Sequence, residues 1–266
     1  MNFYDAHNHL QDDRFAGGQD GLLREAAQAG VVRMVVNGSG VDDWPAVAAL
    51  AARSALVQAS YGVHPWYHHQ QPPGWREDLV ARLVGDPAAA VGEIGLDRWK
   101  GDLPYEGQEE VFLDQWSMAR AFNRPASIHC LKAWGRLLDL LREHPGPACG
   151  FVLHSYGGPA EMVAELAGLG AYFSFPGYFA HARKEKQRAT FLLVPPDRLL
   201  VETDAPDQLL PDERNRFPRQ DAAGRPINHP ANLPAVYAAL AETRGISIET
   251  LASQVERNFL SLFGKG

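Results

Sequence analysis

Residues 3–10 read FYDAHNHL, and this stretch determines how the rest of the chain is interpreted. His7 and His9 stand two positions apart, so their side chains share one face of a strand. The segment begins apolar and turns polar toward its carboxyl end, where parallel α/β sheets carry their sites. Two imidazoles placed there can bind one divalent ion with help from other strands. The pair alone is a weak signal, because His-x-His also occurs by chance.

The composition is that of an ordinary globular protein. Of the 266 residues, 45% are hydrophobic and 21% are charged, so neither disorder nor a fibrous fold is indicated. The length is close to the ~250 residues of a (β/α)8 barrel, and we expect a single domain over residues 1–266. The two cysteines, Cys130 and Cys149, are too few for a disulfide scaffold and fit a reducing compartment. Cys130 is expected to be a packed thiol.

Charge and hydropathy exclude some protein classes. No stretch approaches the ~18 uninterrupted apolar residues of a membrane span, and no signal-peptide pattern opens the chain, so a cytoplasmic protein without membrane association is expected. The net charge of -7 argues against a surface that attracts nucleic acid everywhere. A nucleic-acid substrate stays possible, because bound cations reverse the sign of an acidic pocket. The basic stretch 183–188 is expected to be a solvated helix face.

Short apolar runs alternate with segments of helical periodicity along the chain. After the first strand, further strands are predicted at 31–37, 56–61, 88–93, 126–129, 149–154, 171–174 and 198–202. Helices are predicted at 20–29, 42–53, 75–83, 105–122, 134–142, 159–167, 183–192, 231–243 and 247–262. This alternation predicts an α/β fold, a TIM-type (β/α)8 barrel whose site lies at the C-terminal rim. The aperiodic segment 207–230 is expected to form a substrate-binding lid.

Metal-ligating residue types end almost every predicted strand. They are His7, His9, His64, Glu93, His129, His154 and Asp204. Each one alone has an ordinary explanation, but a barrel brings all its strand ends to one rim. The set exceeds the three protein ligands of one catalytic zinc, so we expect two ions bridged by Glu93. His7, His9 and Asp204 would bind on one side, and His129 and His154 on the other.

Such a centre predicts hydrolysis. Divalent ions lower the pKa of bound water and neutralise charge that develops on a phosphoryl or carbonyl oxygen. Glu93 and Asp204 are the expected catalytic residues, Glu93 as the bridge and Asp204 as the acceptor of the water proton. Mixed imidazole and carboxylate ligands are compatible with Zn²⁺, Mn²⁺ or Mg²⁺, and the many histidines favour the first two.

In order and spacing, the motifs resemble the TatD family of metal-dependent hydrolases, within the amidohydrolase-like barrels. The matching segments are DAHNH at 5–9, GVHP at 62–65, GEIGLD at 92–97, PASIH at 125–129, HSYGG at 154–158, ETDAP at 202–206, and 258–264. The resemblance implies a TIM-type barrel with one to three divalent ions and phosphodiester hydrolysis, typically as a deoxyribonuclease with 3'-to-5' exonuclease activity on DNA. Its metal ligands correspond to His7, His9, Glu93, His129, His154 and Asp204.

Other positions are predicted to face the substrate. His64 matches a family histidine near the substrate, and Asp97 corresponds to an orienting or substrate-side residue. Trp66 and Trp99, in rim loops, are the indoles expected to contact substrate, because aromatic rings stack on bases. The remaining tryptophans are expected to pack in the core.

The chain departs from the family pattern in the pocket wall. Leu131 and Lys132 follow His129 where an arginine is usual, and Lys132 is expected to replace its charge. Asp207 stands where an aromatic residue is usual, and His229 stands where a glutamate often lies near the metals. His229 is therefore a further candidate for substrate binding.

Two other functions stay open on these residues. The altered pocket wall is compatible with a metal-dependent ester or amide hydrolase, such as an aminoacyl-tRNA deacylase, because fold does not determine substrate. A non-catalytic metal-binding protein is the second alternative, against which the complete ligand set argues. The sequence does not indicate an oligomeric state.

Overall fold

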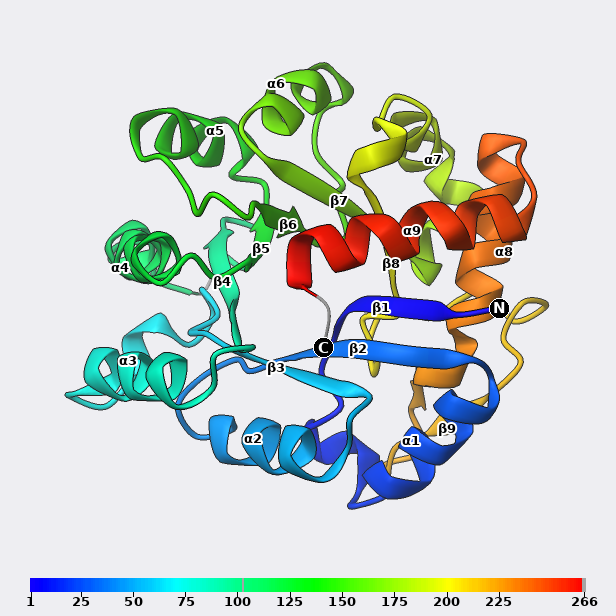
Figure 1. Cartoon of the computed structure of the whole chain (residues 1–266), viewed down its shortest axis with the longest axis horizontal. Coiled ribbons are helices and arrows are strands. Elements are labelled where there is room, and N and C mark those ends of the chain that lie inside the picture. Colours follow the sequence, from blue (N-terminus) through cyan, green and yellow to red (C-terminus); the bar gives the residue numbers. More distant parts are fainter. Residues whose placement is uncertain (102, 265–266) are drawn as a thin grey trace.

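A ring of eight parallel strands forms the centre of the computed structural model, which describes residues 1–101 and 103–264 (Figure 1). The strands are β1 (Phe3–Asn8), β2 (Val31–Asn37), β3 (Val57–Tyr61), β4 (Ala90–Asp97), β5 (Ala126–Leu131), β6 (Phe151–Leu153), β7 (Ala171–Pro176) and β8 (Leu199–Glu202). Each strand pairs with the next one in the sequence. The prediction of a TIM-type barrel is thereby confirmed. Residues 102 and 265–266 of the predicted domain lie outside the described residues.

The first and last strands meet at the barrel seam. Asp204 N donates to His7 O at 3.0 Å, and His9 N donates to Ala205 O at 2.7 Å. Asp5, buried on β1, accepts hydrogen bonds from the backbone N and the Oγ1 of Thr203, at 2.9 and 2.5 Å. These contacts hold the His7–His9 segment against the segment that carries Asp204.

Helices surround the strand ring, as Figure 1 shows. They are α1 (Gln19–Gln28), α2 (Trp44–Arg53), α3 (Trp75–Gly85), α4 (Gln108–Ala121), α5 (Trp134–Glu143), α6 (Val163–Gly168), α7 (Glu185–Phe191), α8 (Leu233–Arg244) and α9 (Ile248–Phe263). None of the helices in the described ranges is both long and apolar enough to cross a membrane.

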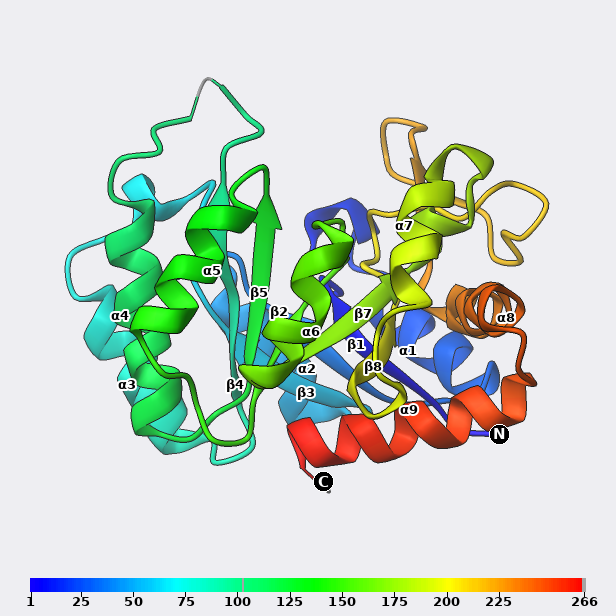
Figure 2. The same ribbon diagram turned by 90° about the horizontal axis from the view of Figure 1, so that it is seen from above.

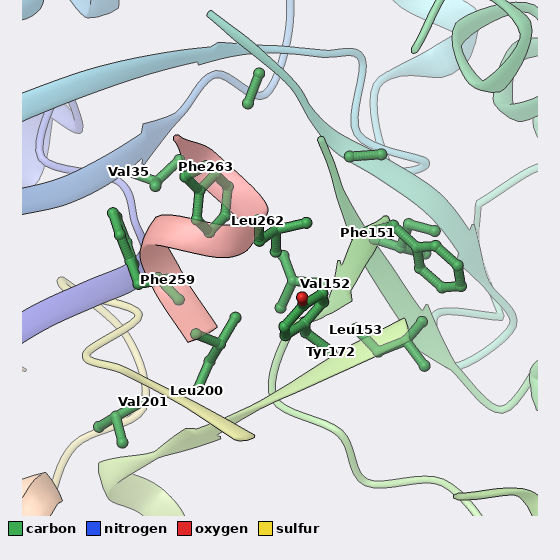
Figure 3. Close-up of a cluster of buried hydrophobic side chains, with 14 of the residues drawn as sticks. Val35, Phe151, Val152, Leu153, Tyr172, Leu200, Val201, Phe259, Leu262 and Phe263 are labelled. Carbon is green, nitrogen blue, oxygen red and sulfur yellow. The ribbon is translucent and has the colours of Figure 1, made fainter. Parts of the chain in front are cut away.

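Helix α9 crosses the end of the barrel where the strands begin, below the strands in Figure 2. Its apolar stripe packs inward, and Phe259 and Leu262 lie beside Val35, Val152 and Leu200 from three strands (Figure 3). Burial of this stripe removes apolar surface from water and stabilises the barrel. The predicted ligands lie toward the opposite end of the barrel, where the strands end.

Several predicted boundaries were wrong for local reasons. Strand β4 continues to Asp97 instead of ending at residue 93, because Ile94 and Leu96 are buried and the strand pairs with β5 through Asp97. The helix predicted from 105 begins at Gln108, after Gly107 with a φ of 86°. The segment 207–230 contains a small antiparallel pair, β9 (Arg219–Gln220) and β10 (Pro226–Ile227).

Candidate metal centre

Glu93, on β4, lies at the centre of the predicted ligands. Its Oε1 is 2.8 Å from His154 Nε2 and 3.0 Å from His129 Nδ1. Its Oε2 is 3.1 Å from His9 Nε2 and 3.5 Å from His7 Nε2. The side chain is almost fully buried, with only 2% of the residue exposed. One carboxylate thus contacts imidazoles on both sides, as the sequence predicts for a bridging ligand.

Asp204 completes the first half of the cluster. Its Oδ1 lies 3.7 Å from the Nε2 atoms of both His7 and His9. The ligand atoms of these three residues all lie within 4.8 Å of one another, a spacing that can hold a metal ion. The same holds for His7, Glu93 and His154 as a second group.

Groups around the first pair of rings fix which nitrogen faces the centre. His9 Nδ1 lies 2.8 Å from the backbone oxygen of Asn37, which can only accept a hydrogen bond. When the ring is neutral, its hydrogen lies on Nδ1, so Nε2 is the nitrogen that could bind a cation beside Glu93. His7 Nδ1 similarly contacts Ser127 Oγ at 2.7 Å, and its Nε2 lies 3.2 Å from His9 Nε2.

In the second pair of rings, His129 has the same arrangement as His9, whereas the buried His154 Nδ1 has no hydrogen-bond partner. Asp97 Oδ2 accepts from His129 Nε2 at 2.8 Å, which leaves the His129 Nδ1 lone pair facing Glu93 and His154. His129 Nδ1 and His154 Nε2 are only 3.3 Å apart. Both nitrogens also face Glu93 Oε1, at 3.0 and 2.8 Å, so the two rings and this carboxylate could offer donor atoms to one cation. The donor chemistry of the site therefore fits divalent metal ions, and imidazole with carboxylate is a ligand set that such ions use.

Three residues that support the ligands were not predicted. Asn37 and Ser127 orient His9 and His7, and the fully buried Glu202 lies 3.7 Å from His154 Nδ1. Glu202 also accepts hydrogen bonds from the backbone N and Oγ of Ser155, at 2.7 and 2.6 Å, and from Ser174 Oγ. Strand alternation is a signal that could have found two of them, because Ser127 and Glu202 each stand two positions before a ligand.

The cluster concentrates charge in a buried space. Burial raises the pKa of Glu93, but His64, His154 and His129 outweigh it and hold the pKa well below the usual value. Burial lowers the pKa of His7 to about 3. For His9, burial also lowers the pKa, but contacts with Glu93 and Asp204 outweigh it and raise the pKa to about 9. An ionised carboxylate among imidazoles is a suitable environment for a cation.

Asp204 differs from Glu93 in its ionisation. Burial raises the pKa of the Asp204 carboxyl to about 8, with the charges of Glu202 and Glu93 adding to the rise while His154 and His9 oppose it. A group with a pKa near neutrality is well suited to accept and release protons.

A cavity of about 580 Å³ opens above the cluster. Four of the predicted substrate contacts line it, namely His64, Trp66, Trp99 and Lys132. Trp99 is the most exposed of the large apolar side chains there, at 55%. Leu131 also lines the cavity and is 37% exposed. We refer to this cavity as the cleft.

The stretch 183–188 is only partly the predicted solvated face: Arg183, Glu185 and Lys186 are exposed, but other residues of the stretch lie at the cleft. Lys184 and Gln187 line the cleft, and Lys184 Nζ lies 4.6 Å from the centre of the Tyr178 ring. The short α7 helix begins only at Glu185, so the preceding turn directs Lys184 toward the cleft. Asp207 and Gln208 line the cleft as well, and they are the residues of the predicted lid that do so among those described.

Two predicted substrate contacts are not among the residues that line the cleft. Asp97 lies behind His129 and orients it, which is the first of the two roles predicted for it. His229 is buried with 3% exposed, its Nε2 lies 2.9 Å from Glu25 Oε2 of α1, and its ring stacks on Phe217 at 5.3 Å. The structure thus gives His229 a packing role, because the turn before α8 directs the ring toward α1.

Cys130 is buried, and burial raises the pKa of its thiol, as expected for a packed cysteine.

Comparisons with known proteins agree with this site. The sequence matches the family model described as TatD related DNase over residues 4–264. It is 30% identical over 263 residues to the metal-dependent hydrolase YjjV of Escherichia coli strain K12, covering 98% of this chain and 97% of the relative. It is 31% identical over 263 residues to the 3'-5' ssDNA/RNA exonuclease TatD of Citrobacter koseri, covering 98% of each chain.

Solved structures give the same result. The crystal structure of the E. coli K12 YjjV protein has a TM-score of 0.89 at 30% identity, covering 99% of this chain and 98% of that one. A hydrolase TatD family protein from Entamoeba histolytica has a TM-score of 0.86 at 18% identity, covering 100% and 99% of the two chains, and shares the fold. Because the family model covers almost the whole chain, this protein belongs to the TatD related DNase family.

Proposed function

We propose that the protein is a metal-dependent 3'-5' exonuclease that acts on single-stranded DNA. The observation that carries this proposal is the contact of Glu93 with imidazoles through both of its oxygens, at the base of an open cleft. Several relatives are named 3'-5' ssDNA/RNA exonuclease TatD, and they match almost the full length of this chain. The chain is thus a metal-dependent hydrolase of the deoxyribonuclease type.

Two divalent cations would be held by these residues. His7, His9 and Asp204 would hold the first, and His129 and His154 the second, with Glu93 contacting both. Zn²⁺, Mn²⁺ or Mg²⁺ bound there would lower the pKa of water and neutralise charge on the phosphoryl group. Asp204 would accept the proton of the attacking water, since its carboxylate lines the cleft beside His7 and His9.

The cleft wall supplies contacts for a single strand. Lys132 and Lys184 line it and would bind backbone phosphates as point charges. Trp66 is held in place, because its Nε1 donates to Asp97 Oδ2 at 2.7 Å and Lys100 Nζ lies 3.6 Å from its ring centre. Trp99 leaves its indole exposed at the cleft and would stack on a base, a contact that contributes ~1–3 kcal/mol.

Digestion of a single strand labelled at its 5' end tests this function. With Mg²⁺ or Mn²⁺ the wild type is expected to produce a ladder that shortens from the 3' end, and a chelator is expected to stop it. Glu93→Ala and Asp204→Ala are expected to abolish the ladder. Glu110→Ala, at an exposed acid of α4, is the matched control and should leave it unchanged. Retained cleavage in both site variants would contradict the proposal.

A second candidate is a metal-dependent ester or amide hydrolase, such as an aminoacyl-tRNA deacylase. The observation in its favour is the cleft wall, where the apolar Leu131 is exposed and Asp12 and Asp207 both pair with Arg14. This wall carries less positive charge than is expected of a surface that binds a polyanionic DNA strand. Carboxyl esters and aminoacyl-tRNA should be assayed beside DNA, and activity on DNA alone would exclude this candidate.

A further inference from the structure

We propose that His64 is not a metal ligand but a neutral N–H donor that hydrogen-bonds an oxygen of the substrate's phosphoryl group. The substrate part of this inference rests on the proposed phosphodiester hydrolysis. The spacing of the ligand atoms alone does not separate His64 from the ligands, because its Nε2 lies 3.3 Å from Glu93 Oε1, and His64, Glu93 and His129 form a group with metal-site spacing. The hydrogen-bond partners of the ring do separate it.

The backbone after His64 determines where its ring hydrogen lies. Trp66 N donates to His64 Nδ1 at 3.0 Å. A backbone amide can only donate, so Nδ1 must accept, and the neutral ring carries its hydrogen on Nε2. The intervening Pro65 has no N–H, and the turn is closed by Tyr67 N donating to His64 O at 2.9 Å. The His-Pro-Trp sequence thereby directs the Trp66 amide to the ring.

The orientation of His64 is opposite to that of two predicted ligands, His9 and His129. His9 and His129 have an acceptor behind the ring, the Asn37 carbonyl and the Asp97 carboxylate, so each turns a lone pair toward the centre. His64 has a donor behind its ring and therefore turns an N–H toward the centre. A nitrogen that carries a hydrogen has no lone pair available for a cation. His64 can contact Glu93 only as a hydrogen-bond donor.

The position of this N–H suits a substrate oxygen. His64 lines the cleft, is 5% exposed, and packs edge-on against His129 at 4.5 Å and Trp66 at 4.9 Å between ring centres. These contacts hold the ring still beside the site where the phosphoryl group must lie to reach the metals. A fixed donor aimed at developing negative charge stabilises a transition state, and removing one such donor costs about 10²–10³ in kcat.

Variants at position 64 distinguish a donor from a ligand. The amide of His64→Gln reaches the position of Nε2 as a donor, whereas the shorter His64→Asn reaches only Nδ1 and His64→Ala has no donor. We expect kcat/KM on single-stranded DNA to fall about 100-fold in the Ala and Asn variants. The Gln variant is expected to have a kcat/KM at least about tenfold higher than that of the Ala variant. Equal activity in Ala and wild type, or no recovery in Gln, would overturn the donor role.

Cation content gives a readout that does not depend on activity. Elemental analysis and calorimetric titration with Mn²⁺ are expected to give the same number of ions and the same affinity in wild type, His64→Ala and His64→Gln. Glu93→Ala is the positive control and should lose ions. Loss of an ion in His64→Ala, with an unchanged melting temperature, would make His64 a ligand and overturn the assignment.

The ring hydrogen itself can be observed in the wild-type protein. Nitrogen-15 NMR of histidine-labelled protein loaded with Zn²⁺ is expected to show His64 as the Nε2–H tautomer, with the signal assigned by its absence in His64→Gln. An Nδ1–H tautomer would overturn the inference. If the wild type cleaves no DNA, the proposed function fails, while the NMR spectrum and the ion count still decide whether His64 is an N–H donor or a ligand.

Discussion

Asp97 Oδ2 lies 2.8 Å from His129 Nε2, so a carboxylate on β4 fixes the ring of a predicted metal ligand on β5. The same oxygen accepts from Trp66 Nε1 at 2.7 Å, and Asp97 Oδ1 accepts from Trp99 N at 2.6 Å. One side chain therefore links the metal centre to both tryptophans of the cleft. A carboxylate behind a metal-ligating imidazole keeps its tautomer and raises its basicity.

Replacing Asp97 by Asn is expected to weaken the second cation site. The neutral amide removes the charge that holds the hydrogen on His129 Nε2, and such a change typically costs about 10–100-fold in metal affinity or activity. Titration with Mn²⁺ and DNA cleavage would measure both. Asp139→Asn is the matched control, because Asp139 is exposed on α5 and pairs with Arg142. An Asp97→Asn protein that binds metal like the control would show that His129 is oriented without the carboxylate.

Asp207→Ala is expected to strengthen binding of single-stranded DNA. Asp207 accepts from Arg14 Nη1 and Nη2 at 2.8 and 2.7 Å, and Asp12 pairs with the same guanidinium. Removal of Asp207 leaves Arg14 with one carboxylate and makes the cleft more positive by one charge. The slope of log affinity against log salt should steepen by about 0.7, the value for one further phosphate contact.

Fluorescence anisotropy with a non-cleavable oligonucleotide would measure this slope. Asp197→Ala removes an exposed acid before β8 that is not among the residues lining the cleft, and it should leave the slope unchanged. A slope that stays the same in Asp207→Ala would show that Arg14 does not reach the strand.

The convergence of the ligands could be predicted from sequence because it depends on two regular features. Strand alternation places His7 and His9 on one face, and parallel topology brings the strand ends to one rim. Neither feature requires knowledge of any side-chain conformation. Glu93 was predicted as the bridge on the same grounds, and its contacts with both sides agree with that role.

Other parts of the site depend on packing that the sequence does not encode locally. The role of Asn37 comes from its backbone oxygen, which any residue type would provide. The burial of His229 depends on how the segment before α8 packs against Glu25. Lys184 stands in a charged stretch that is typical of a solvated face, and only the path of the chain after β7 brings it to the cleft.

Acid is expected to loosen the β9–β10 hairpin before the barrel unfolds. Asp221 accepts from the backbone N of Ala223 and Arg225, both at 2.9 Å, and from Arg225 Nε at 2.7 Å. The Arg225 backbone contact and guanidinium lower the pKa of Asp221 below its ordinary value. A lowered folded-state pKa means that the stabilisation is present above the ordinary pKa of about 3.9 and is lost as the pH falls through the lowered value.

Hydrogen exchange of residues 219–227 measured between pH 6 and pH 3, and corrected for intrinsic rates, would check this expectation. Asp221→Asn should show the faster exchange already at pH 6, because the neutral amide pairs weakly with Arg225. Asp212→Asn, in the same loop region, is the control. Equal exchange in Asp221→Asn and wild type would show that the hairpin does not depend on the carboxylate.

Gly95→Ala is expected to disrupt the metal centre through the backbone. Gly95 lies between Glu93 and Asp97 with a φ of 144°, and a Cβ there would lie 1.9 Å from the backbone oxygen of His129. Strand β5 would have to move away from β4, and His129 would leave Glu93. Backbone strain and overpacking together should cost about 2–6 kcal/mol of unfolding free energy.

Chemical denaturation and Mn²⁺ titration would measure the loss of stability and of cation binding in this variant. Gly85→Ala is the control, because a Cβ at the end of α3 meets no atom within 4 Å. Alanine is favoured over glycine in a helix by about 0.5–1 kcal/mol, so this control should be neutral or slightly more stable. A stable Gly95→Ala protein with full cation binding would contradict this prediction, because it would show that β4 and β5 can separate without moving His129 away from Glu93. The pairing of Gly95 with His129 in the sheet argues against such an outcome.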